Sequence, residues 1–277
     1  MSSKSTASPN PKPKKPRKID LPAPDVRGFR SRLKAFLEET DDQGRTWSNA
    51  KWGVYAFYDY DGEPIYVGQT NEKLRTRIRR HLTNQRSDAV AMRILDVFEV
   101  ADAEMWPLWD MEGVSAKNKD AKKRLDAFEY TAYLNAIEES RFTAILNEKI
   151  PPVSESVEMP PSLRWSLIDD EVREERKHPD IRIARRAETI SRLAAVARER
   201  GEVSEGLRRV LVIQAVRLAF IAAERLAYAE GRPPPDPTAI AIERLVGSVL
   251  CEFTDPYGEG SLNEDDDALD EADGDDG

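Results

Sequence analysis

The chain has 277 residues, of which 40% are hydrophobic and 34% are charged, so it is long enough for one or two domains with a buried core. Its single cysteine, Cys251, excludes an internal disulfide and fits a reducing compartment such as the cytoplasm. The first residues show no apolar signal segment, and the most hydrophobic stretch, residues 210–223, is too short to span a bilayer, so we expect no membrane partner.

Periodicity and turn residues predict the elements in chain order. We expect helices at 25–40, 71–85 and 119–140, a β-hairpin at 51–70 that turns at Asp61-Gly62, and a third strand at 92–101. Prolines at 151, 152, 160 and 161 predict a domain boundary, and residues 163–252 read as helices only, the longest at 204–230. The fold class is therefore α+β: residues 25–152 form a small three-stranded antiparallel sheet flanked by helices, and residues 163–253 form an all-α C-terminal domain.

Charge is segregated along the chain. The net charge is −9, and residues 264–277 carry nine acids and no base, so the remaining residues sum to zero. Residues 1–18 carry six lysines or arginines and no acid. Composition predicts that residues 1–24 are a disordered basic tail and that residues 258–277 are a disordered acidic tail.

The two arms of the hairpin place two tyrosines on one face. With a two-residue turn at Asp61-Gly62, Tyr55 lies opposite Gly68 and Phe57 opposite Tyr66. Side chains alternate along a strand, so Tyr55 and Tyr66 are diagonal neighbours on the same face. Gly68 would leave a gap opposite Tyr55 that a ligand could enter, although two aromatic rings that simply fill a core are the commoner arrangement.

Charged residues of the two following helices can join these tyrosines. Arg77 and His81 lie four residues apart on one margin of an apolar stripe, while Arg75, Arg79 and Arg80 are most simply a solvated face. Glu129 lies within the apolar face of the helix at 119–140. A carboxylate there must be paired, protonated or bound to a cation, because an isolated buried charge is very costly.

These residues, in this order, resemble the GIY-YIG nuclease family. Gly53-Val54-Tyr55 and Tyr66-Val67-Gly68 stand for its two tripeptides, over a resemblance that covers residues 51–152. Four further residues match the family's helix arginine, its frequent histidine, its metal-holding glutamate and its closing asparagine: Arg77, His81, Glu129 and Asn147. The long segment before the glutamate helix looks more like the restriction-enzyme branch than the repair branch.

The resemblance implies metal-dependent hydrolysis of phosphodiester bonds in DNA. Tyr55 would act as general base or orient the water, with Arg77 as a nearby cation that also neutralises phosphate. His81 would relay the proton of Tyr55 or bind phosphate, and Tyr66 would position phosphate or water. Glu129 would hold a single Mg²⁺ (or Mn²⁺) together with water and phosphate oxygens. The candidates for substrate contacts are Gly68, Arg75, Arg79 and Arg80.

Other functions remain compatible with this pattern. The chain could serve restriction, phage defence or a mobile element, and a nuclease for RNA or for branched structures fits the same face. The main alternative is a catalytically idle fold that binds DNA or protein.

The flanking regions suggest further contacts. Residues 182–209 hold eight arginines and four glutamates, so one face could track DNA, and the turn at 198–207 fits a helix-turn-helix or a simple packing pair. We favour a helical domain that binds a protein partner or forms a homodimer. The basic head could add phosphate contacts, and the acidic tail either solubilises the chain or competes with DNA for basic surfaces.

Overall fold

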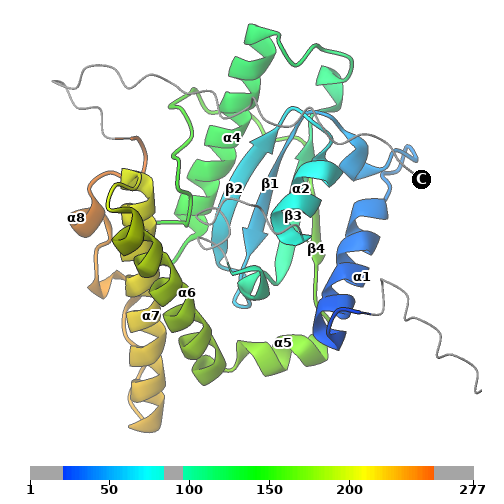
Figure 1. The fold of residues 1–277 in the computed structure, drawn as a ribbon. Helices are drawn as coiled ribbons and strands as arrows, with labels where there is room; N and C mark the ends of the chain where they lie inside the picture. The colour runs from blue at the N-terminus through cyan, green and yellow to red at the C-terminus, as the bar shows by residue number, and fades with distance from the viewer. Residues whose placement is uncertain (1–20, 84–95, 253–277) are drawn as a thin grey trace, which may run out of the picture.

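The computed structural model describes residues 21–83 and 96–252, so the predicted acidic tail and residues 1–20 of the predicted basic tail lie outside the described residues, whereas Pro24 already belongs to the first helix. The fold is α+β, with a four-stranded antiparallel sheet and seven α-helices in the described part of the chain (Figure 1). The strands are β1 (Gly53–Tyr58), β2 (Pro64–Thr70), β3 (Asp102–Pro107) and β4 (Leu163–Ser166). The helices are α1 (Pro24–Glu38), α2 (Leu74–Thr83), α4 (Lys119–Glu139), α5 (Asp170–Lys177), α6 (Pro179–Arg200), α7 (Glu205–Ala229) and α8 (Glu243–Val246). Short 3-10 helices cover Trp47–Asn49, Val97–Glu99, Trp109–Met111 and Pro237–Ala239.

The sheet has the strand order β2-β1-β3-β4, one strand more than the sequence predicted. The extra strand, β4, lies in the segment that we expected to be helical throughout. It pairs antiparallel with β3 from Asp102↔Ser166 to Met105↔Leu163. Arg164 also places its guanidinium 3.5 Å from the centre of the Tyr58 ring on β1. A segment distant in sequence thus forms hydrogen bonds with the backbone groups along the open edge of β3. No local pattern in the sequence predicted this pairing.

The strands of the hairpin pair in the predicted register up to Phe57, but the turn between them is longer than predicted. Tyr55 lies opposite Gly68 and Phe57 opposite Tyr66, but the register shifts after Phe57, so that Tyr58 lies opposite Pro64. The Asp59 amide donates to the Glu63 carbonyl at 2.9 Å, which makes the connection longer than two residues. The Asp59 carboxylate accepts from the amides of Asp61 and Glu63 and thereby holds this wider turn.

The third strand begins ten residues later than predicted. Within the predicted range 92–101, residues 92–95 lie outside the described part, and Val97–Glu99 form a 3-10 helix. The Asp96 side chain accepts from the Phe98 amide and caps that helix at 2.9 Å. The strand itself, β3, alternates buried and half-buried residues, as expected where one face is more covered than the other.

The helices around the sheet follow their apolar faces. The buried side chains of α1 are Phe29, Leu33, Phe36 and Leu37, at the spacing that predicted the helix. Helix α2 begins at Leu74, three residues after the start of the predicted helix at 71–85, and the Leu74 amide donates to the Ala50 carbonyl. In contrast, α4 begins and ends within one residue of the prediction, and Asn118 caps it.

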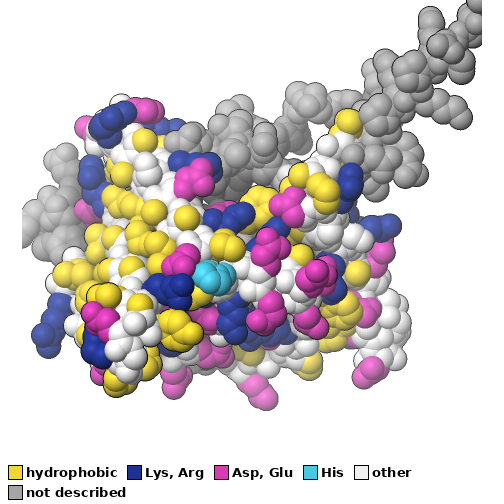
Figure 2. Space-filling model, turned by 90° about the horizontal axis from the view of Figure 1, so that it is seen from below, with side chains coloured by type: hydrophobic (Ala, Val, Ile, Leu, Met, Phe, Trp, Pro, Cys, Tyr) yellow, Lys and Arg dark blue, Asp and Glu magenta, His cyan; other side chains and the backbone are white. Residues whose placement is uncertain are grey.

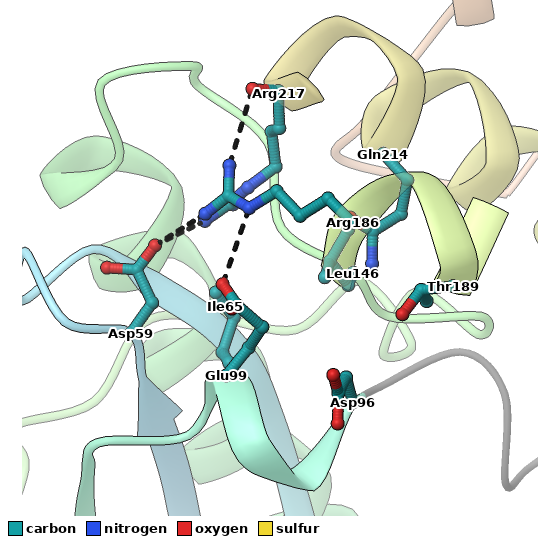
Figure 3. A pocket seen from close by; sticks show the side chains of 9 residues that line it. All are labelled: Asp59, Ile65, Asp96, Glu99, Leu146, Arg186, Thr189, Gln214 and Arg217. Atoms are coloured by element: carbon teal, nitrogen blue, oxygen red, sulfur yellow. Dashed lines mark hydrogen bonds and ion pairs between the residues drawn. The ribbon is translucent and has the colours of Figure 1, made fainter. Parts of the chain in front are cut away.

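The C-terminal segment is not purely helical, since it contains β4, and its helices contact the β-hairpin. Helices α6 and α7 lie side by side (Figure 1), as a packing pair would. They also form ion pairs with the turn of the β-hairpin. Three arginines of these helices surround the buried Asp59 carboxylate: Arg182 at 2.7 Å, Arg186 at 3.0 Å and Arg217 at 3.4 Å. Figure 3 shows two of them converging on Asp59 beside a cavity of about 20 Å³, room for one water molecule.

The buried ion cluster takes two of the eight arginines in residues 182–209 away from the face that was expected to track DNA, whereas Arg192, Arg198 and Arg200 are exposed. Arg182 and Arg186 are buried against Asp59 and Glu99 instead of facing solvent. The three arginines keep the pKa of Asp59 low even though burial opposes its ionisation. Burial lowers the pKa of Arg217 to about 10, an effect that neighbouring Arg186 increases.

Acidic and basic side chains are interspersed on the face of the molecule where α5 lies (Figure 2). Within residues 21–83 and 96–252, no helix is long and apolar enough to cross a membrane.

Candidate active site

The two tyrosines and the histidine of the candidate site meet on one face of the hairpin. The Tyr55 hydroxyl lies 3.2 Å from Nδ1 of His81 on α2. The Tyr66 ring packs edge-on against the His81 ring, with 4.7 Å between centroids, and stacks on Phe57 at 5.9 Å. Tyr55 itself is fully buried, whereas Tyr66 and His81 are half-buried, so the Tyr55 hydroxyl reaches the surface only through its neighbours.

Gly68 provides space for this cluster, and the expected ligand gap opposite Tyr55 is filled. A Cβ atom at position 68 would lie 2.7 Å from the Tyr55 hydroxyl oxygen and 2.9 Å from Cε1 of Tyr66. Tyr55 and Tyr66 therefore occupy the room that the sequence suggested for a ligand. Glycine is required here so that the two phenol groups can approach each other.

Arg77 directs its charge at the same phenol. Burial raises the pKa of Tyr55, while the charge of Arg77 and hydrogen bonding with Arg77 and Tyr66 act in the opposite direction. Burial and the neighbouring Tyr55 raise the pKa of Tyr66 well above its ordinary value. The phenolate form is therefore better stabilised at Tyr55 than at Tyr66.

The Arg77 side chain has one further donor. Its Nε is buried and has no hydrogen-bond partner within the described residues. A buried N–H without an acceptor is unfavourable, so this atom marks a place where an anionic group would bind well.

Glu129 lies in the middle of α4, close enough to raise the pKa of Tyr55 and Tyr66 and to have its own pKa lowered by Arg77. Burial raises the pKa of Glu129 to about 8, and the neighbouring Asp126 carboxylate adds to the shift. Arg77 and hydrogen bonds from Gln69 lower it only in part. Of the alternatives that the sequence left open, the structure favours a carboxylate that is protonated at neutral pH or bound to a cation.

Gln69 is the neighbour that the sequence analysis missed. Its side-chain amide donates to Asp126 at 2.8 Å, and its Oε1 atom is buried without a hydrogen-bond partner among the described residues. The only signal in the sequence was its position, next to Gly68 but on the opposite face of β2.

These oxygens fit a hard divalent cation. The described residues contain no group of three or more His, Cys, Asp or Glu side chains that could hold a metal ion. Mg²⁺, however, is often held by one or two carboxylates and several waters. Glu129 supplies one carboxylate whose ionisation needs a positive charge, and the orphaned Oε1 of Gln69 supplies a neutral oxygen.

Asn147 lies away from the phenols, behind the edge strand of the sheet. Its side chain accepts from the Val67 amide at 3.0 Å and donates to the Val67 carbonyl at 2.8 Å. The side chain thus pairs with the free edge of β2 as a neighbouring strand would, between Tyr66 and Gly68. This geometry gives Asn147 a positioning role and no direct contact with the phenol cluster.

The predicted substrate-binding arginines of α2 do not act as one group. Arg75 donates to the Asn49 side chain at 3.2 Å, and Arg80 forms an ion pair with Glu72 at 2.8 Å. Arg79 is exposed, and its guanidinium has no hydrogen bond or ion pair within the described residues.

Comparison with known protein families agrees with this geometry. Residues 51–134 match the family model of the GIY-YIG catalytic domain. The chain contains a GIY-YIG catalytic domain. The GIY-YIG match includes both tyrosines, Arg77, His81 and Glu129, and it ends before Asn147. No curated protein and no solved structure matches the chain.

GIY-YIG domains are typical of endonucleases that act on DNA and generally use divalent metal ions. The match therefore implies a nuclease-type function for this protein. The helices α1 and α5 to α8 and the strand β4 lie outside the matched residues.

Proposed function

We propose that this protein is a metal-dependent endonuclease that hydrolyses phosphodiester bonds in DNA. The observation that supports it most is the convergence on one phenol oxygen, that of Tyr55. Nδ1 of His81 lies 3.2 Å from it, and Arg77 and Tyr66 both lower the pKa of this hydroxyl against the effect of burial. A tyrosine that only filled the core would not require this set of partners.

The geometry supports a division of roles. Because Tyr55 is buried and its pKa is raised, it holds its proton at neutral pH until a base accepts it. His81 is the base within reach, so we assign it the relay of the Tyr55 proton. The donors from Arg77 and Tyr66 then stabilise the phenolate, which orients and deprotonates the attacking water.

Arg77 has a second role toward the substrate. The buried Nε without a partner offers a charged hydrogen bond to a phosphate oxygen, and this contact would strengthen as charge develops there. We therefore assign phosphate binding to Arg77.

We propose that one Mg²⁺ or Mn²⁺ ion binds at Glu129, with Gln69 as a neighbouring oxygen. When bound, the ion would neutralise charge on the phosphate and assist the leaving oxygen. Glu129 would ionise with it, because the positive charge of the cation would offset the effect of burial on the pKa of Glu129. Asn147 would fix the β2 edge that carries Tyr66 and Gly68.

The test is nicking and linearisation of supercoiled plasmid with Mg²⁺, using the native chain, Glu129→Ala and Glu138→Ala. Glu138 is an exposed acid on the same helix and serves as the matched control. We expect the native chain and Glu138→Ala to cleave, and Glu129→Ala to lose at least 100-fold of the rate, on the order of an electrostatic contribution to catalysis.

Two outcomes would contradict the proposal. Equal cleavage by all three proteins would place the activity at another site. Inertness of the native chain on plasmid, single-stranded and branched DNA, with DNA binding retained, would favour the binding module instead.

A further inference from the structure

A groove between α1 and α2 lies outside the tyrosine cluster and partly outside the GIY-YIG match. The two helices lie against each other (Figure 1) and enclose a groove of about 320 Å³. Helix α1 precedes residue 51, so one wall of the groove belongs to a part of the chain that the family match does not include. The lining residues are Arg30, Leu33, Lys34, Leu37, Arg79 and Thr83.

The groove is cationic, with no acidic side chain among its lining residues. Arg30 on α1 and Arg79 on α2 both line the groove, and neither guanidinium has a hydrogen bond or ion pair within residues 21–83 and 96–252. Lys34 is paired only with Glu38, at 3.7 Å and with both side chains more than half exposed, so its charge remains available. Leu33 and Leu37 are buried and form an apolar base beneath these charges.

Most other arginines near the sheet have acidic partners. Arg80 pairs with Glu72, Arg173 with Asp102, and Arg182 with Asp59. Two of the three cations of the groove, Arg30 and Arg79, are therefore without an acidic partner among the described residues, whereas these neighbouring arginines are paired. Like charges on two facing helices produce a positive potential that adds up in a concave surface. The residues that precede α1 in sequence, 1–18, carry six further basic side chains and no acid.

The position of the groove relates it to the candidate active site. Arg79 lies on α2 between Arg77 and His81, and it projects from the opposite side of the helix. A helix with its side chains is roughly 10 Å wide. At about 3.4 Å per nucleotide along one strand, a phosphate in the groove would lie roughly three nucleotides from the bond that is cut.

We propose that the groove between α1 and α2 binds the sugar-phosphate backbone that flanks the cleaved bond. This inference rests on the proposed function for the choice of polymer. It assigns to α1 a part in substrate binding that the GIY-YIG domain alone does not provide. Recognition is by phosphate charge, so it adds affinity without sequence preference.

The experiment measures binding without cleavage. In a Glu129→Gln background, Arg30, Lys34 and Arg79 are all replaced by glutamine, and a control protein carries Arg192→Gln, Arg198→Gln and Arg200→Gln. The control removes three exposed positive charges from α6 and has the same net charge. Fluorescence anisotropy with a labelled 20-base-pair duplex gives Kd as a function of salt concentration.

We expect the groove variant to bind roughly 10- to 100-fold more weakly near 0.1 M salt. The slope of log Kd against log salt should fall by roughly two to three, since each phosphate contact contributes about 0.9. The control should keep the slope of the parent. Thermal unfolding of both variants, and the single change Arg79→Gln with a slope loss of about one, exclude a folding defect.

The outcomes separate this inference from the proposed function. An unchanged slope in the groove variant, or an equal loss in the control, overturns the groove as a binding site even if the native chain cleaves DNA. A specific slope loss in the groove variant supports the groove, and it does so even if the native chain proves inert in the cleavage assay.

Discussion

At the scale of the residue, the site depends on one ionisable carboxyl and two phenols held in a small volume. Burial raises the pKa of Glu129 to about 8, and Arg77 compensates only in part. Burial also raises the pKa of Tyr55, although three polar groups contact its oxygen. Each group is therefore held in its protonated form in the isolated protein, so that substrate and cation would have to shift it.

The raised pKa of Glu129 makes a prediction about stability. The pKa of this group is higher in the folded state than in the unfolded chain, where it is near 4.5, so its ionisation costs stability. Stability is complete at low pH and is lost as the pH rises from about 4.5 to about 8. We expect Glu129→Gln to leave the melting temperature unchanged at pH 4.5 and to raise stability at pH 9 by on the order of a few kcal/mol.

Thermal unfolding at the two pH values checks this, with Glu138→Gln as the exposed control. Addition of Mg²⁺ at pH 9 should stabilise the native chain more than Glu129→Gln. A melting temperature difference that does not depend on pH would show that Glu129 ionises normally.

Gly68 makes a second prediction at this scale. Gly68→Ala puts a methyl group 2.7 Å from the Tyr55 hydroxyl, so either the ring or the strand must move. We expect a loss of roughly 1–3 kcal/mol in the free energy of unfolding, together with a loss of cleavage. The control is Gly28→Ala on α1, where a Cβ meets nothing within 4 Å and a gain of about 0.5–1 kcal/mol is expected. Chemical denaturation measures both, and equal effects would contradict the tight packing at Gly68.

At the scale of the element, the edge of β2 is the feature that orders the site. Tyr66 and Gly68 belong to an edge strand, and the Asn147 side chain occupies the position where a further strand would pair. The Leu146 amide adds a hydrogen bond to the Ile65 carbonyl at 2.8 Å. The segment after α4 thus fixes the strand that carries half of the phenol cluster.

Replacement of Asn147 tests this connection. Asn147→Ala leaves the buried amide and carbonyl of Val67 without partners, so we expect a loss of about 1–3 kcal/mol in stability. Hydrogen exchange at the Val67 amide should accelerate more than at amides in the centre of β1. Asn135→Ala, an exposed asparagine on α4, is the control. Unchanged exchange at Val67 would mean that the edge is held by other contacts.

At the scale of the whole molecule, the segment beyond residue 152 packs against the GIY-YIG domain through a β-strand and a buried ion cluster. Strand β4 covers the edge of β3, and Arg182, Arg186 and Arg217 neutralise the buried Asp59 at the hairpin turn. Asp59 and Arg217 are each only 1% exposed. Removal of one side of a buried ion cluster leaves the other side uncompensated, which is strongly destabilising.

We therefore expect a chain that ends at Pro161 to lack a cooperative thermal transition, although it includes all residues of the family match. A chain that ends at Asn263 removes only the acidic stretch and should unfold like the full chain. Circular dichroism and calorimetry check both. A stable, cooperatively folded chain 1–161 would show that the two regions are independent domains.

The sequence by itself determined the local features of this protein. A hairpin turn near Asp61-Gly62 led to the pairing of Tyr55 with Gly68, although the turn itself is longer than predicted, and apolar spacing predicted α1, α4 and α7, because these features depend on neighbours within a few residues. The order of the two tripeptides, Arg77 and Glu129 pointed to the GIY-YIG family that the comparison found.

Only the tertiary structure decided what depends on distant partners. The fourth strand forms because residues 163–166 meet the open edge of β3, and Arg182 and Arg186 of α6 are buried because they pair with Asp59, more than 120 residues earlier in the chain. The gap at Gly68 is filled, and Gln69 joins Glu129, because ring positions and side-chain amides are set by packing in three dimensions. A linear pattern carries the chemistry of each residue, whereas burial and charge balance arise only when segments far apart in sequence come into contact.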